Sequence, residues 1–285
     1  MGKCLRGFHY ASSHDIPCLR QPAGVVLTSR REVLIAGVAG LAGSAVSAAA
    51  ASAPILGLIS PVDVIVPPEA TALYPSGIDF RAVSVGLKTM TPEGYDAVLD
   101  RIAPAAQTLA AQGAQAIALM GTSLSFYQGA AFNRELTRRM AAATGLPAVT
   151  MSTAVIEGLR SVGGKRLAVA TAYNDDVNAR LRSYLQEEGF EVLGIKGLGI
   201  QNVGDILSVT GKDLIAFSVG VAEATRGADA LLISCGGLRT LDLIDPIEQR
   251  CGLPVVSSLP HALRAGVRLL GLSGRAPRYG RLLSQ

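Results

Sequence analysis

Short apolar runs alternate with amphipathic stretches along the chain from Pro54 onward. Most of the runs are flanked by Gly or Pro, and several are continuously apolar, as in strands that are buried on both faces of a parallel sheet. The expected strands are Ile55–Ile59, Phe80–Val85, Ala116–Met120, Ala148–Met151, Leu167–Thr171, Glu191–Gly194, Ala230–Ser234 and Pro254–Ser257, and the expected helical stretches are Thr91–Gln112, Arg134–Thr144, Asp176–Glu188 and Asp213–Arg226. This alternation predicts an α/β protein in which helices cover both faces of parallel sheets.

A repeated segment indicates two related halves. Gln112–Thr122 aligns with Arg226–Gly236, and each segment holds a Gly-Ala turn, a buried strand and a loop of small residues. The match is short, so independent use of a common α/β pattern is the alternative to a duplication. The alignment places Gly121 and Cys235 at equivalent strand ends, and ligands of open parallel sheets bind at such ends. If the two halves face each other, both positions flank one cleft.

Composition and charge exclude several classes of protein. The chain is 49% hydrophobic and 17% charged, which is typical of a globular protein. The net charge of +4 arises mostly from residues 1–53, and the nearly neutral remainder shows no basic run interleaved with aromatics, so we expect no nucleic-acid partner. A metal site made of Cys and His is not expected, because no C-x-x-C occurs and His261 is the only histidine after residue 53.

Residues 1–53 have the pattern of a leader. Arg30 and Arg31 precede a weakly hydrophobic stretch that carries no charge between Glu32 and Pro54, which resembles a twin-arginine export signal. A retained membrane anchor and a non-functional extension are the alternatives. We therefore expect a periplasmic or exported protein that engages the export machinery, with a cytoplasmic location as the alternative.

Cys235 follows a buried strand and precedes Gly236 and Gly237. A glycine-containing loop at a strand end exposes backbone N–H groups toward an anion. A thiol at that position can exchange a proton with a bound carbanion or act as a nucleophile. The alternative is an inert buried cysteine, which is a common state of free cysteines. The loop by itself leaves both interpretations open.

Two further strand ends carry polar groups. Thr122 and Ser123 offer hydroxyls and amides, and Tyr173 can direct its hydroxyl into the cleft. Helix capping is the alternative for Thr122 and Ser123, although capping and anion binding use the same donors. A solvated surface position is the alternative for Tyr173. The sequence shows no Ser-His-Asp arrangement, phosphate-binding loop or metal motif.

Several segments carry a family resemblance when they are taken together. They are Thr91–Asp96, Gly121–Tyr127, Ala170–Tyr173 with Asp175–Asn178, and Ser234–Leu238. In this order they resemble the bacterial arylmalonate decarboxylases of the aspartate/glutamate racemase superfamily, and the similarity runs from about Ile55 to Leu282. The resemblance implies two pseudo-symmetric Rossmann-like lobes, each a four-stranded parallel sheet flanked by helices, with the active site in the inter-lobe cleft. We expect lobe 1 to comprise residues 54–161 and 262–285, and lobe 2 residues 162–261.

The resemblance also implies roles for individual residues. Racemases of the superfamily place one cysteine on each lobe, whereas this chain has Cys235 on one lobe and Gly121 opposite, as in the decarboxylase branch. The family's dioxyanion hole, which binds the carboxylate that is retained, corresponds to Thr122, Ser123, Tyr173 and the amides of Cys235 and Gly236. Its apolar pocket for the carboxylate that leaves corresponds to Leu87, Met90, Tyr95, Val203 and Ile206.

The implied activity is decarboxylation of an α-aryl or α-vinyl malonate to the monoacid. An enediolate forms, and Cys235 protonates it on one face as a neutral thiol. No metal or other cofactor is implied, the only substrate is a small dicarboxylate, and we expect a monomer. The alternatives are a racemase or a maleate-type cis–trans isomerase of the same superfamily, and a non-catalytic exported carboxylate-binding protein.

Overall fold

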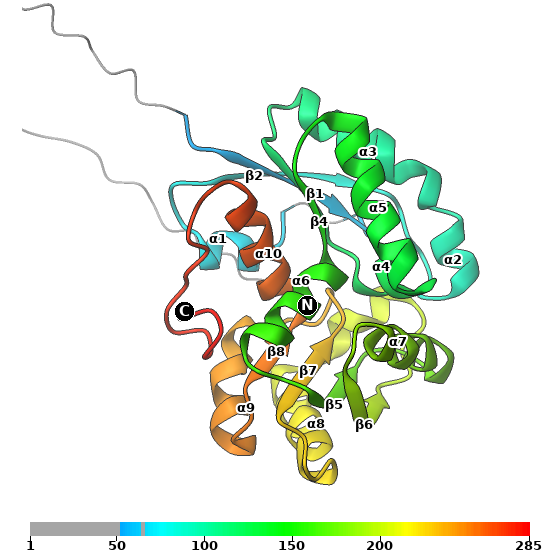
Figure 1. Cartoon of the computed structure of the whole chain (residues 1–285), viewed down its shortest axis with the longest axis vertical. Helices are drawn as coiled ribbons and strands as arrows, with labels where there is room; N and C mark the ends of the chain where they lie inside the picture. Colours follow the sequence, from blue (N-terminus) through cyan, green and yellow to red (C-terminus); the bar gives the residue numbers. More distant parts are fainter. Residues whose placement is uncertain (1–51, 64–65) are drawn as a thin grey trace, which may run out of the picture. The chain divides into compact units, whose positions relative to one another are not determined.

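Two parallel sheets organise the chain. The computed structural model describes residues 52–63 and 66–285, so the predicted leader lies almost entirely outside the described residues. Within these residues the first sheet has the order β2-β1-β3-β4 and the second β6-β5-β7-β8, with parallel pairing throughout (Figure 1). The strands are β1 Ile55–Ser60, β2 Asp79–Ser84, β3 Ala116–Leu119, β4 Ala148–Thr150, β5 Arg166–Thr171, β6 Glu191–Gly197, β7 Ala230–Ser234 and β8 Val255–Ser257. The predicted fold class is confirmed.

All eight expected strands are present, and the two sheets repeat the same strand order. The largest differences between the expected and the observed strands concern the residues at which the strands end. Met151 is the first residue of a helix and not the last of a strand, because the Thr150 hydroxyl accepts a hydrogen bond from the Thr153 amide at 3.1 Å and starts the helix there. Strand β6 continues to Gly197, three residues further than the sequence indicated.

The helices surround the sheets. They are α1 Pro68–Leu73, α2 Pro92–Asp96, α3 Ile102–Ala111, α4 Thr122–Phe126, α5 Gly129–Thr144, α6 Met151–Ser161, α7 Asp175–Glu187, α8 Gly211–Ala224, α9 Ile244–Cys251 and α10 Ser258–Leu269. Figure 1 shows α3 and α5 on one side of the first sheet and α1 and α10 on the other. The single stretch expected over Thr91–Gln112 is divided into α2, a short 3₁₀ turn and α3. None of the helices in the described part of the chain has the length and apolarity that a bilayer crossing requires.

Helices α6 and α10 connect the two sheets. Helix α10 follows β8 of the second sheet but contacts β3 and β4 of the first, and α6 follows β4 but contacts β8. The two helices also pack against each other. A Cβ atom at Gly266 of α10 would lie 2.7 Å from Leu56 Cδ2, so the helix approaches β1 more closely than any larger residue allows. The lobe boundaries drawn from the sequence stay a prediction.

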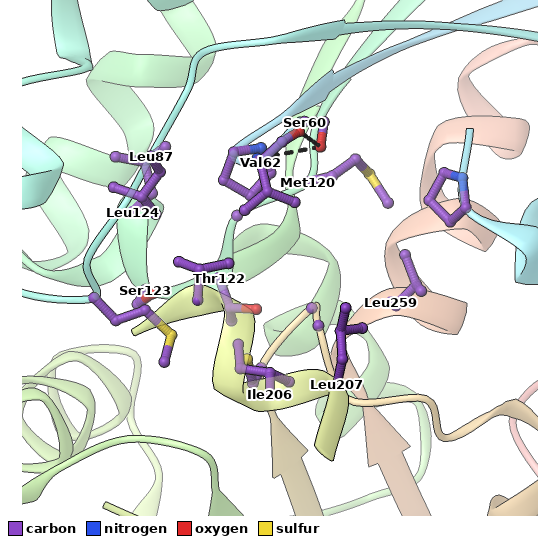
Figure 2. Close-up of a pocket in the computed structure, with 18 of the residues that line it drawn as sticks. Ser60, Val62, Leu87, Met120, Thr122, Ser123, Leu124, Ile206, Leu207 and Leu259 are labelled. Atoms are coloured by element: carbon purple, nitrogen blue, oxygen red, sulfur yellow. Dashed lines mark hydrogen bonds between the residues drawn. The ribbon is translucent and has the colours of Figure 1, made fainter. Parts of the chain in front are cut away.

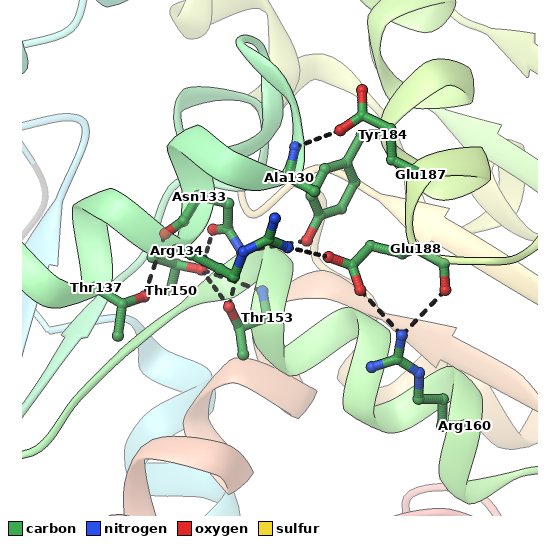
Figure 3. A network of polar contacts seen from close by, with 10 residues as sticks. All are labelled: Ala130, Asn133, Arg134, Thr137, Thr150, Thr153, Arg160, Tyr184, Glu187 and Glu188. Carbon is green, nitrogen blue, oxygen red and sulfur yellow. Dashed lines mark hydrogen bonds and ion pairs between the residues drawn. The ribbon is translucent and has the colours of Figure 1, made fainter.

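A polar network joins α5, which packs on the first sheet, to α7 of the second (Figure 3). Glu187 of α7 accepts a hydrogen bond at 2.7 Å from the Ala130 amide in the first turn of α5. The neighbouring Glu188 binds Arg160 at 2.9 Å and Arg134 at 3.4 Å. Carboxylates of the second half therefore hold a helix end of the first half, which fixes the two halves relative to each other.

Candidate active site

A cavity of about 350 Å³ lies where the two sheets meet. Its wall includes residues that directly follow β1, β3, β5 and β7, among them Pro61, Gly121, Tyr173 and Cys235. These are the carboxyl ends of the two central strands of each sheet, the position at which open parallel sheets bind ligands. The two halves thus contribute equivalent strand ends to a single cavity.

Ten of the eleven residues that the sequence analysis selected line this cavity. They are Leu87, Met90, Gly121, Thr122, Ser123, Tyr173, Val203, Ile206, Cys235 and Gly236. Tyr95 is the exception, because it is fully buried behind the wall and its ring packs against that of Tyr127 at a centroid distance of 4.9 Å. The structure therefore brings the candidates together, while the role of each residue stays a prediction.

The Cys235 thiol is buried and protonated. The residue is 4% exposed, and burial raises the pKa of its thiol to about 11, against weaker lowering effects from the Gly237 and Leu238 amides and the Tyr173 hydroxyl. At neutral pH the group is an S–H donor and not a thiolate. A neutral thiol is suited to deliver a proton to a carbanion and poorly suited to nucleophilic attack.

The backbone of Cys235 is also held in place. Its amide donates to the Ser258 hydroxyl at 3.2 Å, and its carbonyl accepts from the Leu238 amide at 3.3 Å. The first contact competes with the role that the sequence analysis gave to this amide in a dioxyanion hole. The donors that remain for a carboxylate at this wall are the Gly236 amide and the hydroxyls of the neighbouring strand ends.

The loop between β3 and α4 supplies two of those hydroxyls. Thr122 and Ser123 are the first residues of α4, whose initial amides have no partner within the helix. The Thr122 hydroxyl donates to the sulfur of Met151, a weak acceptor, at 2.9 Å. Behind the loop, Ser125 donates to the Gly121 carbonyl at 2.8 Å, and Ser152 donates to the Thr122 carbonyl at 2.9 Å. The donors are therefore fixed before any ligand binds.

Tyr173 contributes a further hydroxyl from the end of β5. Its side chain is 1% exposed, and its oxygen lies 3.4 Å from the Ser234 hydroxyl. Burial raises the pKa of Tyr173 well above its ordinary value, with a further increase from the nearby Cys235 thiol. The phenol therefore stays protonated and can donate a hydrogen bond to an anion.

Two glycines at the strand ends line the cavity but have different surroundings. A Cβ atom at Gly236 would lie 2.9 Å from the Met151 sulfur and 3.1 Å from the Met120 carbonyl oxygen, so a larger residue would force Met151 and the Met120 backbone to move. At Gly121 the nearest atom would be Leu124 Cβ at 3.1 Å, and φ is −127°, which any residue adopts. Gly121, which we predict to lie opposite Cys235, can therefore accept a small side chain after a slight shift of Leu124.

The cavity contains residues that sequence reasoning missed. Figure 2 shows Leu87 and Leu124 on one side of Thr122, and Met120 and Leu259 on the other. Leu124 belongs to a segment that carried the family resemblance, so it could have been selected. Leu259 lies on α10, for which the sequence gave no signal. Further lining residues outside the prediction are Leu58, Ser60, Pro61, Val62, Asp63, Pro67, Pro68, Glu69, Ala82, Gly204, Leu207, Gly237 and Arg239.

Comparison with known proteins identifies the family of the chain. The family model described as arylmalonate decarboxylase matches residues 56–283. A curated arylmalonate decarboxylase of Bordetella bronchiseptica is 48% identical over 234 residues, which cover 81% of this chain and 97% of that protein. The chain belongs to the arylmalonate decarboxylase family, and the predicted resemblance is confirmed.

Solved structures agree with this assignment. A liganded arylmalonate decarboxylase variant, in which a glycine is replaced by cysteine and a cysteine by serine, has a TM-score of 0.78 at 48% identity and covers 80% of this chain and 98% of its own. A maleate cis–trans isomerase of Nocardia farcinica bound to TRIS has a TM-score of 0.75 at 23% identity, and the match covers 81% of this chain and 98% of that one. The second likeness shows that the fold is shared.

Proposed function

We propose that this protein decarboxylates α-aryl or α-vinyl malonates without a cofactor and releases one enantiomer of the monoacid. The observation that carries the proposal is the asymmetry of the cavity. One strand end presents Cys235 as a buried neutral thiol, and the equivalent strand end presents Gly121, which has no functional group. A single proton donor on one side of the substrate favours protonation on one face.

Binding of the substrate divides its two carboxylates between different surroundings. The carboxylate that is retained accepts hydrogen bonds from Thr122, Ser123 and Tyr173, and from the amide of Gly236. The other carboxylate lies among the apolar side chains of Leu87, Met90, Val203 and Ile206. An ionised carboxylate is poorly solvated there, whereas CO₂ is neutral and apolar, so bond cleavage relieves the mismatch.

The chemical step needs no external reagent. The bond between the α-carbon and the leaving carboxylate breaks, CO₂ departs, and the electron pair is delocalised over the retained carboxylate and the aryl or vinyl group. Fixed hydroxyl and amide donors stabilise the charge that grows on the enediolate oxygens. The α-carbon then takes the proton of the Cys235 thiol, and water restores that proton after the product has left.

The test compares two cysteine variants. The purified protein is incubated with phenylmalonate or a prochiral methyl-substituted analogue, and CO₂ release and the optical activity of the product are followed. Cys235→Ala is expected to lower the rate by about a hundredfold to ten-thousandfold, because the proton donor is lost. Cys251→Ala is the matched control, since Cys251 is the other free cysteine of the described residues and lies outside the cavity.

Three outcomes would contradict the proposal. Full activity of Cys235→Ala would show that another group donates the proton. Tight binding of malonates without CO₂ release would indicate a carboxylate-binding protein. Conversion of maleate, or racemisation of an amino acid, would indicate the activity of a relative within the superfamily.

We also propose that residues 1–53 direct export by the twin-arginine route. Arg30, Arg31 and the uncharged stretch that follows them support this. Fractionation of cells that produce the protein, with and without replacement of both arginines by lysine, tests it. An unchanged cytoplasmic location in both cases would contradict export.

A further inference from the structure

One charged side chain in the cavity has no assigned role. Glu69 lies in the first turn of α1 and is 9% exposed, so nine-tenths of it is buried. It lines the same cavity as Cys235. Its carboxylate makes no hydrogen bond and no ion pair with the residues that the structure describes. A carboxylate oxygen that lines a cavity and has no protein partner is available to accept a hydrogen bond from a ligand.

The other two charged residues that line the cavity, Asp63 and Arg239, differ from Glu69 in their surroundings. Asp63 already accepts hydrogen bonds from Ser84 at 2.7 Å and from Lys88 at 3.2 Å. Arg239 is exposed and forms no ion pair with Glu69. Glu69 is therefore the one buried charge among the described lining residues that faces the cavity without a partner.

Glu69 and Leu259 reach the cavity from two different helices. Helix α1, which carries Glu69, contacts α10, which carries Leu259. In Figure 2, Leu259 and Met120 lie on the opposite side of Thr122 from Leu87 and Leu124. With one carboxylate at Thr122 and the other at Leu87, we take the α-substituent to lie on the side of Leu259 and Met120. This side has apolar walls, and Glu69 lines the same cavity.

We propose that Glu69 is a recognition site for the α-substituent, and that the preferred substituent is an aromatic ring bearing an O–H or N–H donor, such as a phenol or an aniline. The inference rests on the proposed function, because it takes the malonate carboxylates to lie at Thr122 and Leu87. The ring packs against Leu259 and Met120, and its donor binds the Glu69 carboxylate. A site built to bind a donor discriminates strongly against the analogue that lacks it.

The first experiment measures kcat/KM for the three hydroxyphenylmalonate isomers and for phenylmalonate. The readout is kcat/KM of the best isomer divided by kcat/KM of phenylmalonate. The wild-type protein is expected to prefer that isomer by about tenfold or more, as for a hydrogen bond to a charged group. Glu69→Leu is expected to bring the ratio to about one, and Glu69→Gln, which keeps the shape and a neutral acceptor, to lower it about fivefold. Asp63→Asn is the matched control and is expected to keep the ratio within about twofold.

A second experiment does not depend on turnover. Calorimetry compares the binding of hydroxyphenylacetate and phenylacetate, the corresponding monoacids, to the wild-type protein and to Glu69→Leu. A preference of about tenfold for hydroxyphenylacetate that disappears in the variant supports the Glu69 site. This holds even if no malonate loses CO₂, because the absence of CO₂ release would refute only the proposed function. Equal binding of the two acids to the wild type, or a preference that Glu69→Leu retains, would overturn the inference.

Discussion

His261 gives a prediction about stability in acid that follows directly from its surroundings. The side chain is 3% exposed on α10, and its Nδ1 atom lies 2.9 Å from the Ser257 amide nitrogen and 2.6 Å from the Ser257 carbonyl oxygen. Its Nε2 atom is buried and has no hydrogen-bond partner among the described residues. Burial lowers the pKa of His261 from 6.5 to about 4, and the nearby Arg264 lowers it further.

The direction of the pH effect follows from comparing proton binding to His261 in the folded and the unfolded protein. Between pH 6.5 and pH 4 the unfolded chain binds a proton at this histidine and the folded protein does not, so the free energy of unfolding falls as the pH falls. The contribution is fully present above about pH 7.5 and is lost progressively down to the folded pKa. With the pKa values above, the loss is roughly 2 kcal/mol at pH 5 and about 3 kcal/mol by pH 4.

Urea unfolding between pH 7.5 and pH 4.5 measures this loss. Far-UV circular dichroism is the appropriate signal, because the chain contains no Trp. His261→Gln removes the titrating group and keeps a polar side chain, so the difference between wild type and variant isolates the histidine from the carboxylates. The unfolding free energy of the wild type is expected to fall more steeply than that of the variant by the amounts given above. Parallel pH profiles would show that His261 is not held neutral by burial.

Three further predictions concern the site and the contact between the halves. Gly121→Cys places a second proton donor opposite Cys235 after a small shift of Leu124; chiral chromatography of the product should show eroded selectivity, and full selectivity would mean that Gly121 does not face the substrate. Because burial raises the pKa of Cys235 to about 11, kcat should stay constant from pH 7 to about pH 10 and fall only above it; a loss already at pH 8 would contradict donation by a neutral thiol. Glu187→Gln weakens the acceptor for the Ala130 amide and should lower the free energy of unfolding by about 1 kcal/mol in urea titrations; an unchanged midpoint would show that this contact does not stabilise the fold.

The sheets were predictable because their strands carry an unambiguous pattern. β1 and β7 are short, mainly apolar runs that each end at a serine, and nearly all their side chains are buried. The short helices were harder to predict from periodicity. α4 has five residues and α1 has six, so neither is long enough to show a helical repeat. α10 is long enough, but it follows β8 without a loop and its first turns are buried, so no turn residue separates strand from helix in the sequence.

The site was predictable where it follows from strand ends and not where it depends on packing. Cys235 and Gly121 were paired through the internal repeat, which reports on topology. Glu69 and Leu259 were missed because they reach the cavity from α1 and α10, and only the contact between these helices brings them there. Tyr95 was placed in the pocket by resemblance; its side chain is fully buried and is not among the residues that line the cavity, and its role stays a prediction.

α10 is the last helix of the chain, yet it packs on the first sheet. The first sheet therefore cannot be completed when its own four strands have been synthesised. All four strands of the first sheet precede the second sheet in the sequence, yet the helix that covers β3 and β4 follows β8. Because Gly266 lies directly against Leu56 of β1, the first sheet keeps an open apolar face until the last helix has been made. A ribosome-bound chain halted after β5 would therefore expose that face to chaperones, and the two halves, despite their matching topology, should mature in one final step.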